Sequence, residues 1–110
     1  MINTTNELKD FIINCLEEKK AENITVLDLG DNVSIAKYMI IASGRSSRNV
    51  AAIGDYVSHE IKKNTIINVG LEGLTKAEWV LVDCGDIIVH LFHPEAREKY
   101  KLEELWNVKK

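Results

Sequence analysis

Residues 79–100 read WVLVDCGDIIVHLFHPEAREKY, and this stretch predicts a β-hairpin followed by a short helix. Two apolar runs of strand length flank Gly85 and Asp86, a two-residue connection that favours a tight hairpin turn. Pro94 lacks an amide donor, and its fixed backbone angle suits the first turn of a helix. The second strand should therefore end before Pro94, and a helix should run to about residue 100.

Pairing across the turn sets Cys84 opposite Ile87 and Asp83 opposite Ile88. Side chains alternate along a strand, so the hairpin has two faces of different chemistry. One face is apolar apart from a thiol and is predicted to be core; it carries Val80, Val82, Cys84, Ile87, Val89 and Leu91. The other face includes an acid and an imidazole; it carries Trp79, Leu81, Asp83, Ile88, His90 and Phe92. Two interpretations of this second face stay open: a docking surface, or a layer of core covered by the N-terminal helix.

The rest of the chain alternates helical and strand patterns. Helices are expected over residues 5–20 and 47–63, strands over 24–29, 38–42 and 65–69, a lead-in to the second strand over 33–35, and a loop over 70–74. The run at residues 39–42 is apolar on both faces, which is typical of an interior strand covered on both sides. These elements predict an α/β (α+β) fold, a single domain over residues 1–110 with a mixed sheet and helices packed on it.

Composition and charge narrow the function classes. The chain has 110 residues, 45% of them hydrophobic, and no apolar run of membrane-spanning length or signal-peptide pattern, so a cytoplasmic protein is expected. Cys15 and Cys84 form no CxxC unit and are expected to be buried, reduced thiols. A net charge of -3 argues against affinity based on phosphate neutralisation. A macromolecular partner should therefore be a basic protein, with RNA contact secondary.

A possible anion site lies in the loop before the second long helix. Its candidate residues are Arg45, Ser46, Ser47 and Arg48. Amides at a helix start, two serines and two arginines could hold a phosphate, but no GxxxxGK[ST] or GxGxxG pattern is present. The alternative is that a serine caps the helix and the arginines meet acidic neighbours or a partner.

Two long motifs resemble one known family. The runs YMIIASGRSSRNVAAIGDYV at 38–57 and GLEGLTKAEWVLVDCGDIIVHLFHPEAREKYKLEELW at 70–106 are similar to the ribosomal silencing factor family, also called the Iojap family. The resemblance spans about residues 24–106. It implies a non-enzymatic protein without a cofactor that docks on the large ribosomal subunit, blocks its joining to the small one and lowers translation when nutrients run short. It also implies self-association as a homodimer.

The family is similar in fold to the nucleotidyltransferases, which raises an enzymatic alternative based on the loop at residues 43–48. Those enzymes need a Gly-Ser loop and paired carboxylates for two magnesium ions. Here the loop reads Ser43-Gly44-Arg45, and the closest approach to a carboxylate pair is Asp83 and Asp86, which flank a tight turn. We therefore expect the fold without the chemistry.

The predicted docking surface is centred on the second face of the hairpin. It comprises Trp79, Leu81, Asp83 and His90, flanked by the acidic Glu72, Glu78 and Asp86. An aromatic anchor among polar residues is typical of interface cores, and acidic side chains complement a basic protein. His90 and His93 should point to opposite sides, so no metal site is expected. Near the C-terminus an apolar anchor is expected from Leu102, Leu105 and Trp106.

Overall fold

The computed structural model describes residues 2–30, 36–73 and 76–100, the last residue in its backbone only. The elements are α1 (Thr5–Glu18), β1 (Glu22–Asp28), β2 (Tyr38–Ser43), α2 (Ser47–Asn64), β3 (Gly70–Glu72), β4 (Trp79–Asp83), β5 (Ile87–Phe92) and α3 (Pro94–Tyr100). The expected lead-in at 33–35 and the anchor formed by Leu102, Leu105 and Trp106 lie outside the described residues.

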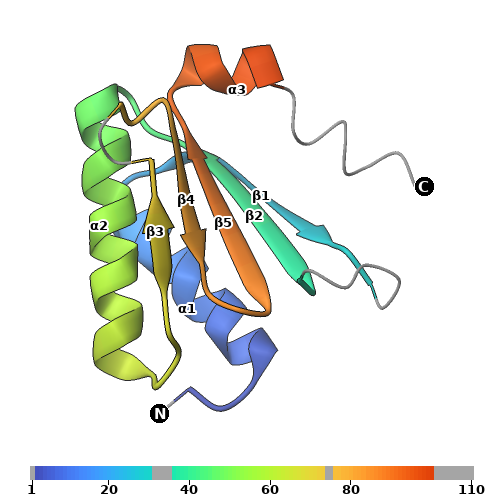
Figure 1. The fold of residues 1–110 in the computed structure, drawn as a ribbon. Helices are drawn as coiled ribbons and strands as arrows, with labels where there is room; N and C mark the ends of the chain where they lie inside the picture. The colour runs from blue at the N-terminus through green and yellow to red at the C-terminus, as the bar shows by residue number, and fades with distance from the viewer. Residues whose placement is uncertain (1, 31–35, 74–75, 101–110) are drawn as a thin grey trace.

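The five strands form one mixed sheet in the order β1-β2-β5-β4-β3. β2 and β5 pair parallel, whereas the other neighbouring pairs are antiparallel. The predicted mixed sheet with helices packed on it is therefore confirmed. β5 lies at the centre of the sheet, between β2 and β4 (Figure 1). The helix α2 connects β2, on one side of β5, to β3 at the far edge on the other side.

The predicted hairpin and its register are confirmed. Asp83 pairs with Ile88, and the amide of Cys84 donates to the carbonyl of Ile87 at 2.9 Å. Gly85 has φ of +83°, a conformation that L side chains rarely adopt, and its amide donates to the Asp83 carboxylate at 3.0 Å. The turn therefore selects glycine at this position.

We call the helix-covered side of the sheet the inner face. Its six hairpin residues are each at most 2% exposed and match the predicted core set: Val80, Val82, Cys84, Ile87, Val89 and Leu91. α1 and α2 both pack there, through Leu8, Ile12, Cys15 and Leu16 of α1 and Val50, Ile53, Val57 and Ile61 of α2. A Cβ at Gly54 would lie 2.7 Å from Cγ1 of Val80, so glycine lets α2 approach β4 closely. The predicted burial of both thiols is confirmed, since Cys84 is 2% and Cys15 is 3% exposed. This burial raises the pKa of Cys84 to about 12 and of Cys15 to about 11.

The position of α1 contradicts one of the two interpretations of the hairpin. α1 lies behind the strands on the inner face, so the N-terminal helix does not cover the face that carries Trp79 (Figure 1). The apolar stripe of a helix shows that one side is buried, but it does not say which face of a sheet buries it. A capping box begins α1: Thr4 accepts from the amide of Glu7, and amides of Asn3 and Thr4 donate to Glu7 and lower the pKa of its carboxyl.

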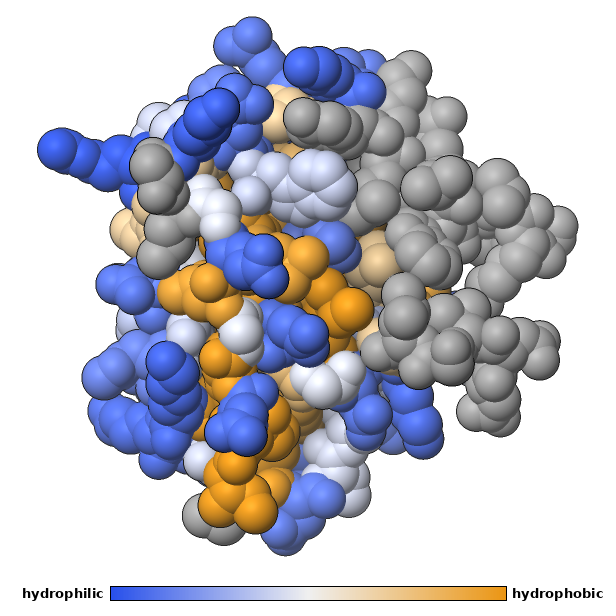
Figure 2. All heavy atoms as spheres, in the orientation of Figure 1, coloured by the Kyte–Doolittle hydropathy of each residue, from blue (hydrophilic) through white to orange (hydrophobic). Residues whose placement is uncertain are grey.

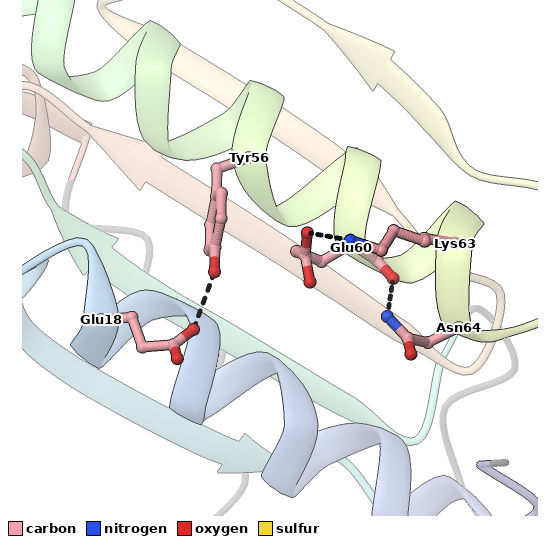
Figure 3. Close-up of polar contacts among 5 residues, drawn as sticks. All are labelled: Glu18, Tyr56, Glu60, Lys63 and Asn64. Atoms are coloured by element: carbon pink, nitrogen blue, oxygen red, sulfur yellow. Dashed lines mark hydrogen bonds and ion pairs between the residues drawn. The ribbon is translucent and has the colours of Figure 1, made fainter.

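A side-chain contact joins the two helices on their solvent side. The hydroxyl of Tyr56 on α2 donates to Glu18 on α1 at 2.8 Å (Figure 3). This bond to a carboxylate is the largest of the effects that raise the pKa of Tyr56 to about 12. Lys19 lies 4.4 Å above the same ring. The two helices therefore form one layer that is held together on both its buried and its exposed side.

The prediction for residues 65–74 was wrong. Residues 65–69 form no strand, and the edge strand β3 begins at Gly70, where a loop was expected. The amide and hydroxyl of Thr65 both donate to the carbonyl of Ile61, so Thr65 ends α2 instead of starting a strand. Ile66 is 92% exposed, whereas Ile67 and Val69 are partly buried against the inner core without belonging to a strand. Across the described residues, the helices are too short or too polar to cross a membrane.

Candidate docking surface

The outer face is the side of the sheet opposite α1 and α2. Over β1 and β2 it is closed: Leu27, Leu29, Met39 and Ile41 are buried and cluster with Phe92 of β5 and Ala96 of α3. Over β4 it is open, because Trp79 and Leu81 are half-buried and Asp83 is exposed. The outer face therefore changes across the sheet from core to surface, and the change falls at β5.

We call the open part of this face the docking strip; it consists of Trp79, Leu81 and Asp83 on β4 and Ile88 on β5. In Figure 2, apolar surface gathers along the middle of the face in view, over the strands, and hydrophilic side chains border it. Glu72 pairs with Leu81 across the ladder, so its carboxylate lies on the same face. The strip is thus an apolar surface with exposed carboxylates at its border.

Two predicted surface residues turn away from the strip. The carboxylate of Asp86 accepts a hydrogen bond from the hydroxyl of Thr5 on α1 at 3.1 Å, which directs it toward the inner side. Glu78 precedes β4 and lines a hollow of about 360 Å³ with Ser47, His93, Glu95, Ala96 and Lys99. The structure therefore brings Trp79, Leu81, Asp83, Glu72 and His90 together on one face and places Asp86 and Glu78 beside it.

A hydrogen bond between Trp79 and His90 orders the centre of the outer face. The indole Nε1–H of Trp79 donates to Nδ1 of His90 at 2.9 Å. Phe92 completes the cluster, with its ring centroid 5.0 Å from that of Trp79 and 6.3 Å from that of His90. The sequence placed these residues on one face but did not reveal the bond. The register of the hairpin could have indicated it: Trp79 pairs with Phe92, so His90, two residues before Phe92, is the diagonal cross-strand neighbour of Trp79.

His90 is neutral at physiological pH. Only 5% of the residue is exposed, and this burial lowers the pKa of its imidazole to about 4. A neutral imidazole carries one proton, and Nδ1 accepts from Trp79, so the proton belongs on Nε2. Nε2 is buried and has no hydrogen-bond partner among the described residues. The outer face thus holds one fixed hydrogen bond and one unused donor.

Arg97, to which the sequence analysis gave no role, ties α3 to the sheet. Its guanidinium donates to the hydroxyl of Ser43 on β2 at 2.9 Å and to the hydroxyl of Thr25 on β1 at 3.1 Å. Ser43 is buried, and a buried hydroxyl needs such a partner. The amide of His93 donates to the carbonyl of Glu78 at 2.9 Å, which fixes the other end of α3 beside β4.

The loop before α2 is arranged for capping. Ser46 is the N-cap, and its hydroxyl accepts from the amide of Asn49 at 3.1 Å. In return the Asn49 side chain accepts from the amide of Arg45 at 2.8 Å. Ser47 lines the same hollow as Glu78, Glu95 and Lys99, so two carboxylates and one ammonium group lie near it. The capping interpretation of Ser46 is confirmed, while Arg45 and Arg48 lie exposed.

Residues suited to metal binding do not gather in the described parts of the chain. There, no group of three or more His, Cys, Asp or Glu side chains lies close enough to hold an ion. Asp83 and Asp86, the closest approach to a carboxylate pair, make separate contacts with Gly85 and Thr5. The groups that this region presents are an apolar strip, exposed carboxylates and a neutral imidazole.

Comparisons with known proteins agree on one family. Residues 2–110 match the family model described as ribosomal silencing factor during starvation. A protein of Zymomonas mobilis named ribosomal silencing factor RsfS is 46% identical over 99 residues, which cover 90% of this chain and 74% of that protein. A mouse protein named mitochondrial assembly of ribosomal large subunit protein 1 is 31% identical over 103 residues, 91% of this chain and 45% of that protein. A crystal structure from Chromobacterium violaceum superposes with a TM-score of 0.90 at 36% identity and covers 94% of this chain and 87% of that one.

Proposed function

The chain belongs to the ribosomal silencing factor family, and we propose that it represses translation under nutrient limitation by docking on the large ribosomal subunit and excluding the small one. It acts by steric exclusion and turns over no substrate. The observation that carries the proposal is the docking strip, an open apolar surface with exposed carboxylates in a sheet whose other side is core.

The strip has the chemistry and rigidity of an interface. Protein interfaces favour an aromatic anchor at the centre with polar groups around it, and Trp79 and Asp83 fit these two positions. β4 is paired on both sides, and its alternate residues Val80 and Val82 are buried in the core. The strip is therefore held in position before a partner arrives, which limits the entropy lost on binding.

The charge of the strip supports a basic protein as the contact on the large subunit. Asp83 and Glu72 are exposed on the outer face, and the whole chain has a net charge of -3. Complementary charge speeds encounter and excludes partners of like charge. Contact with ribosomal RNA is then secondary, because phosphate neutralisation needs a basic surface.

We further propose that the free protein is a homodimer in the cytoplasm. An apolar strip left open to water favours a covering partner, and a second copy can supply one before the ribosome does. The sedimentation of the purified protein measures this directly. A monomer mass at micromolar concentration would contradict the dimer without bearing on the ribosomal role.

The central test is an assay of subunit joining. Purified protein is added to separated ribosomal subunits, which are then resolved on a sucrose gradient. We expect the profile to shift from joined particles toward free subunits, with the protein sedimenting with the large one. Sedimentation with the small subunit alone, or undisturbed joining at saturating protein, would exclude the proposal.

A charge reversal locates the contact. Asp83→Lys should bind the large subunit far more weakly, because like charges brought together across an interface cost several kcal/mol. Its stability should change by at most about 1 kcal/mol, since the side chain is exposed and loses only its bond to the Gly85 amide. Asp55→Lys, at an exposed position on α2, is the matched control and should bind like the parent. If Asp83→Lys binds as the parent does, the contact lies elsewhere.

A further inference from the structure

The buried imidazole of His90 carries a donor that the free protein does not use. Its Nε2 is buried and without a hydrogen-bond partner among the described residues. Buried polar side-chain atoms are hydrogen-bonded in the large majority of cases, because a lost bond to water is not replaced otherwise. An unpaired donor at this position therefore destabilises the free protein.

The bond from Trp79 fixes which nitrogen is the donor. The indole N–H can only donate, so Nδ1 of His90 must be an acceptor and the ring proton must lie on Nε2. Protonation of both nitrogens would break this bond and place a charge in a buried site, which burial disfavours. The tautomer is thus determined by the geometry, and Nε2–H is the unsatisfied group.

The place of His90 in the sheet relates this donor to the docking strip. His90 pairs with Leu81 across the hairpin, and the Trp79 ring lies 5.7 Å from the imidazole at 46°. Trp79 and Leu81 are members of the strip, so the imidazole lies beside the surface that we assign to docking.

Resting on the proposed function, we propose that His90 is a further binding residue of the docking strip, and that on docking its Nε2–H donates to a main-chain carbonyl of the partner while Nδ1 keeps its bond from Trp79. A carbonyl fits better than a carboxylate, because the exposed Asp83 and Glu72 on this face would repel an anion. The free protein thus holds a donor whose acceptor comes with the partner. A site of this kind discriminates against partners that lack the acceptor, since they leave the donor unpaired.

Two substitutions test this inference. His90→Phe keeps a planar ring and removes the donor, whereas His90→Gln keeps an amide donor that reaches about as far as Nε2. For His90→Phe we expect an unfolding midpoint equal to or above that of the parent, and an affinity for the large subunit at least tenfold lower. His90→Gln should recover a part of that affinity. The half-buried indole of Trp79 can turn its N–H to water in either variant.

The outcomes separate the inference from the proposed function. If the parent protein itself does not bind large subunits, the proposed function fails, and with it this role of His90. If the parent binds and His90→Phe binds equally well, the docking role stands and the inference is overturned. His90→Gln binding no more tightly than His90→Phe would also overturn it.

Discussion

The two faces of one hairpin differ sharply in burial and in chemistry. On the inner face every hairpin side chain is apolar or a thiol and is buried under α1 and α2. On the outer face, side chains from the same two strands range from the buried Phe92 to the exposed Asp83. Strand alternation thus lets the sequence specify stability on one side and, as we propose, binding on the other, and a single substitution can address either one.

Two leucines in this hairpin provide the strongest test of that division. Leu91 is fully buried on the inner face, whereas Leu81 is half-buried on the outer face. Leu91→Ala should lower the free energy of unfolding by about 2 to 5 kcal/mol, because it removes buried area and leaves a cavity. Leu81→Ala should lower it by about 1 kcal/mol or less while weakening large-subunit binding.

Chemical denaturation measures both stabilities, and co-sedimentation measures binding. Equal losses of stability in the two variants would show that the outer face is core as well. Normal binding by Leu81→Ala would remove this residue from the docking strip but leave the inner face as described.

The pH dependence of stability tests the same comparison, since His90 is a buried ionisable group on the face that carries the strip. Burial lowers the pKa of its imidazole from an ordinary value of 6.5 to about 4. The unfolded chain therefore takes up a proton at a higher pH than the folded chain does. Stability that is present above pH 6.5 should be lost as the pH falls toward 4, by about 3 kcal/mol in total.

The parent and His90→Phe should be unfolded side by side between pH 7.5 and pH 4. Carboxylates and the other two histidines contribute to both proteins, so the difference between them isolates His90. As the pH falls below 6.5, we expect the free energy of unfolding of the variant to rise relative to that of the parent by about 1.4 kcal/mol per pH unit. A difference that does not change with pH would mean that His90 is solvated in the folded protein.

The smallest expected effect concerns the end of the sheet near the start of α2. Arg45 and Arg48 are exposed, and the serine beside them caps the helix. Replacing both arginines by alanine should leave calorimetry with ATP and magnesium without a heat of binding, as in the parent. A clear heat in the parent that disappears in the double variant would restore the nucleotide-binding alternative and would place a third functional surface beside the two faces.

The hairpin could be predicted from the sequence because its determinants are local. Gly85 and Asp86 select the turn, the turn sets the register, and alternation then assigns each side chain to a face. The buried set of six hairpin residues follows from these steps alone. Capping was also readable, since Thr4 and Ser46 act on amides three residues away.

Other features depend on contacts between distant residues and could not be predicted in this way. The apolar residues at 65–69 suggest a strand, but Thr65 ends α2 and the edge of β4 pairs with residues 70–72 instead. Periodicity showed that α1 buries one side without showing which face of the sheet receives it. Likewise the guanidinium of Arg97 meets Thr25 across 72 positions of sequence, and no local pattern encodes that contact.

The central position of β5 has a consequence for the order of folding. β5 pairs parallel with β2, which joins Tyr38 to Ile87 and requires the intervening chain, with α2, to close a long loop first. The docking strip spans β4 and β5, so it is complete only when both strands have been synthesised and have paired. A chain that acts in the proposed way therefore has no complete docking strip until β5 has joined the sheet.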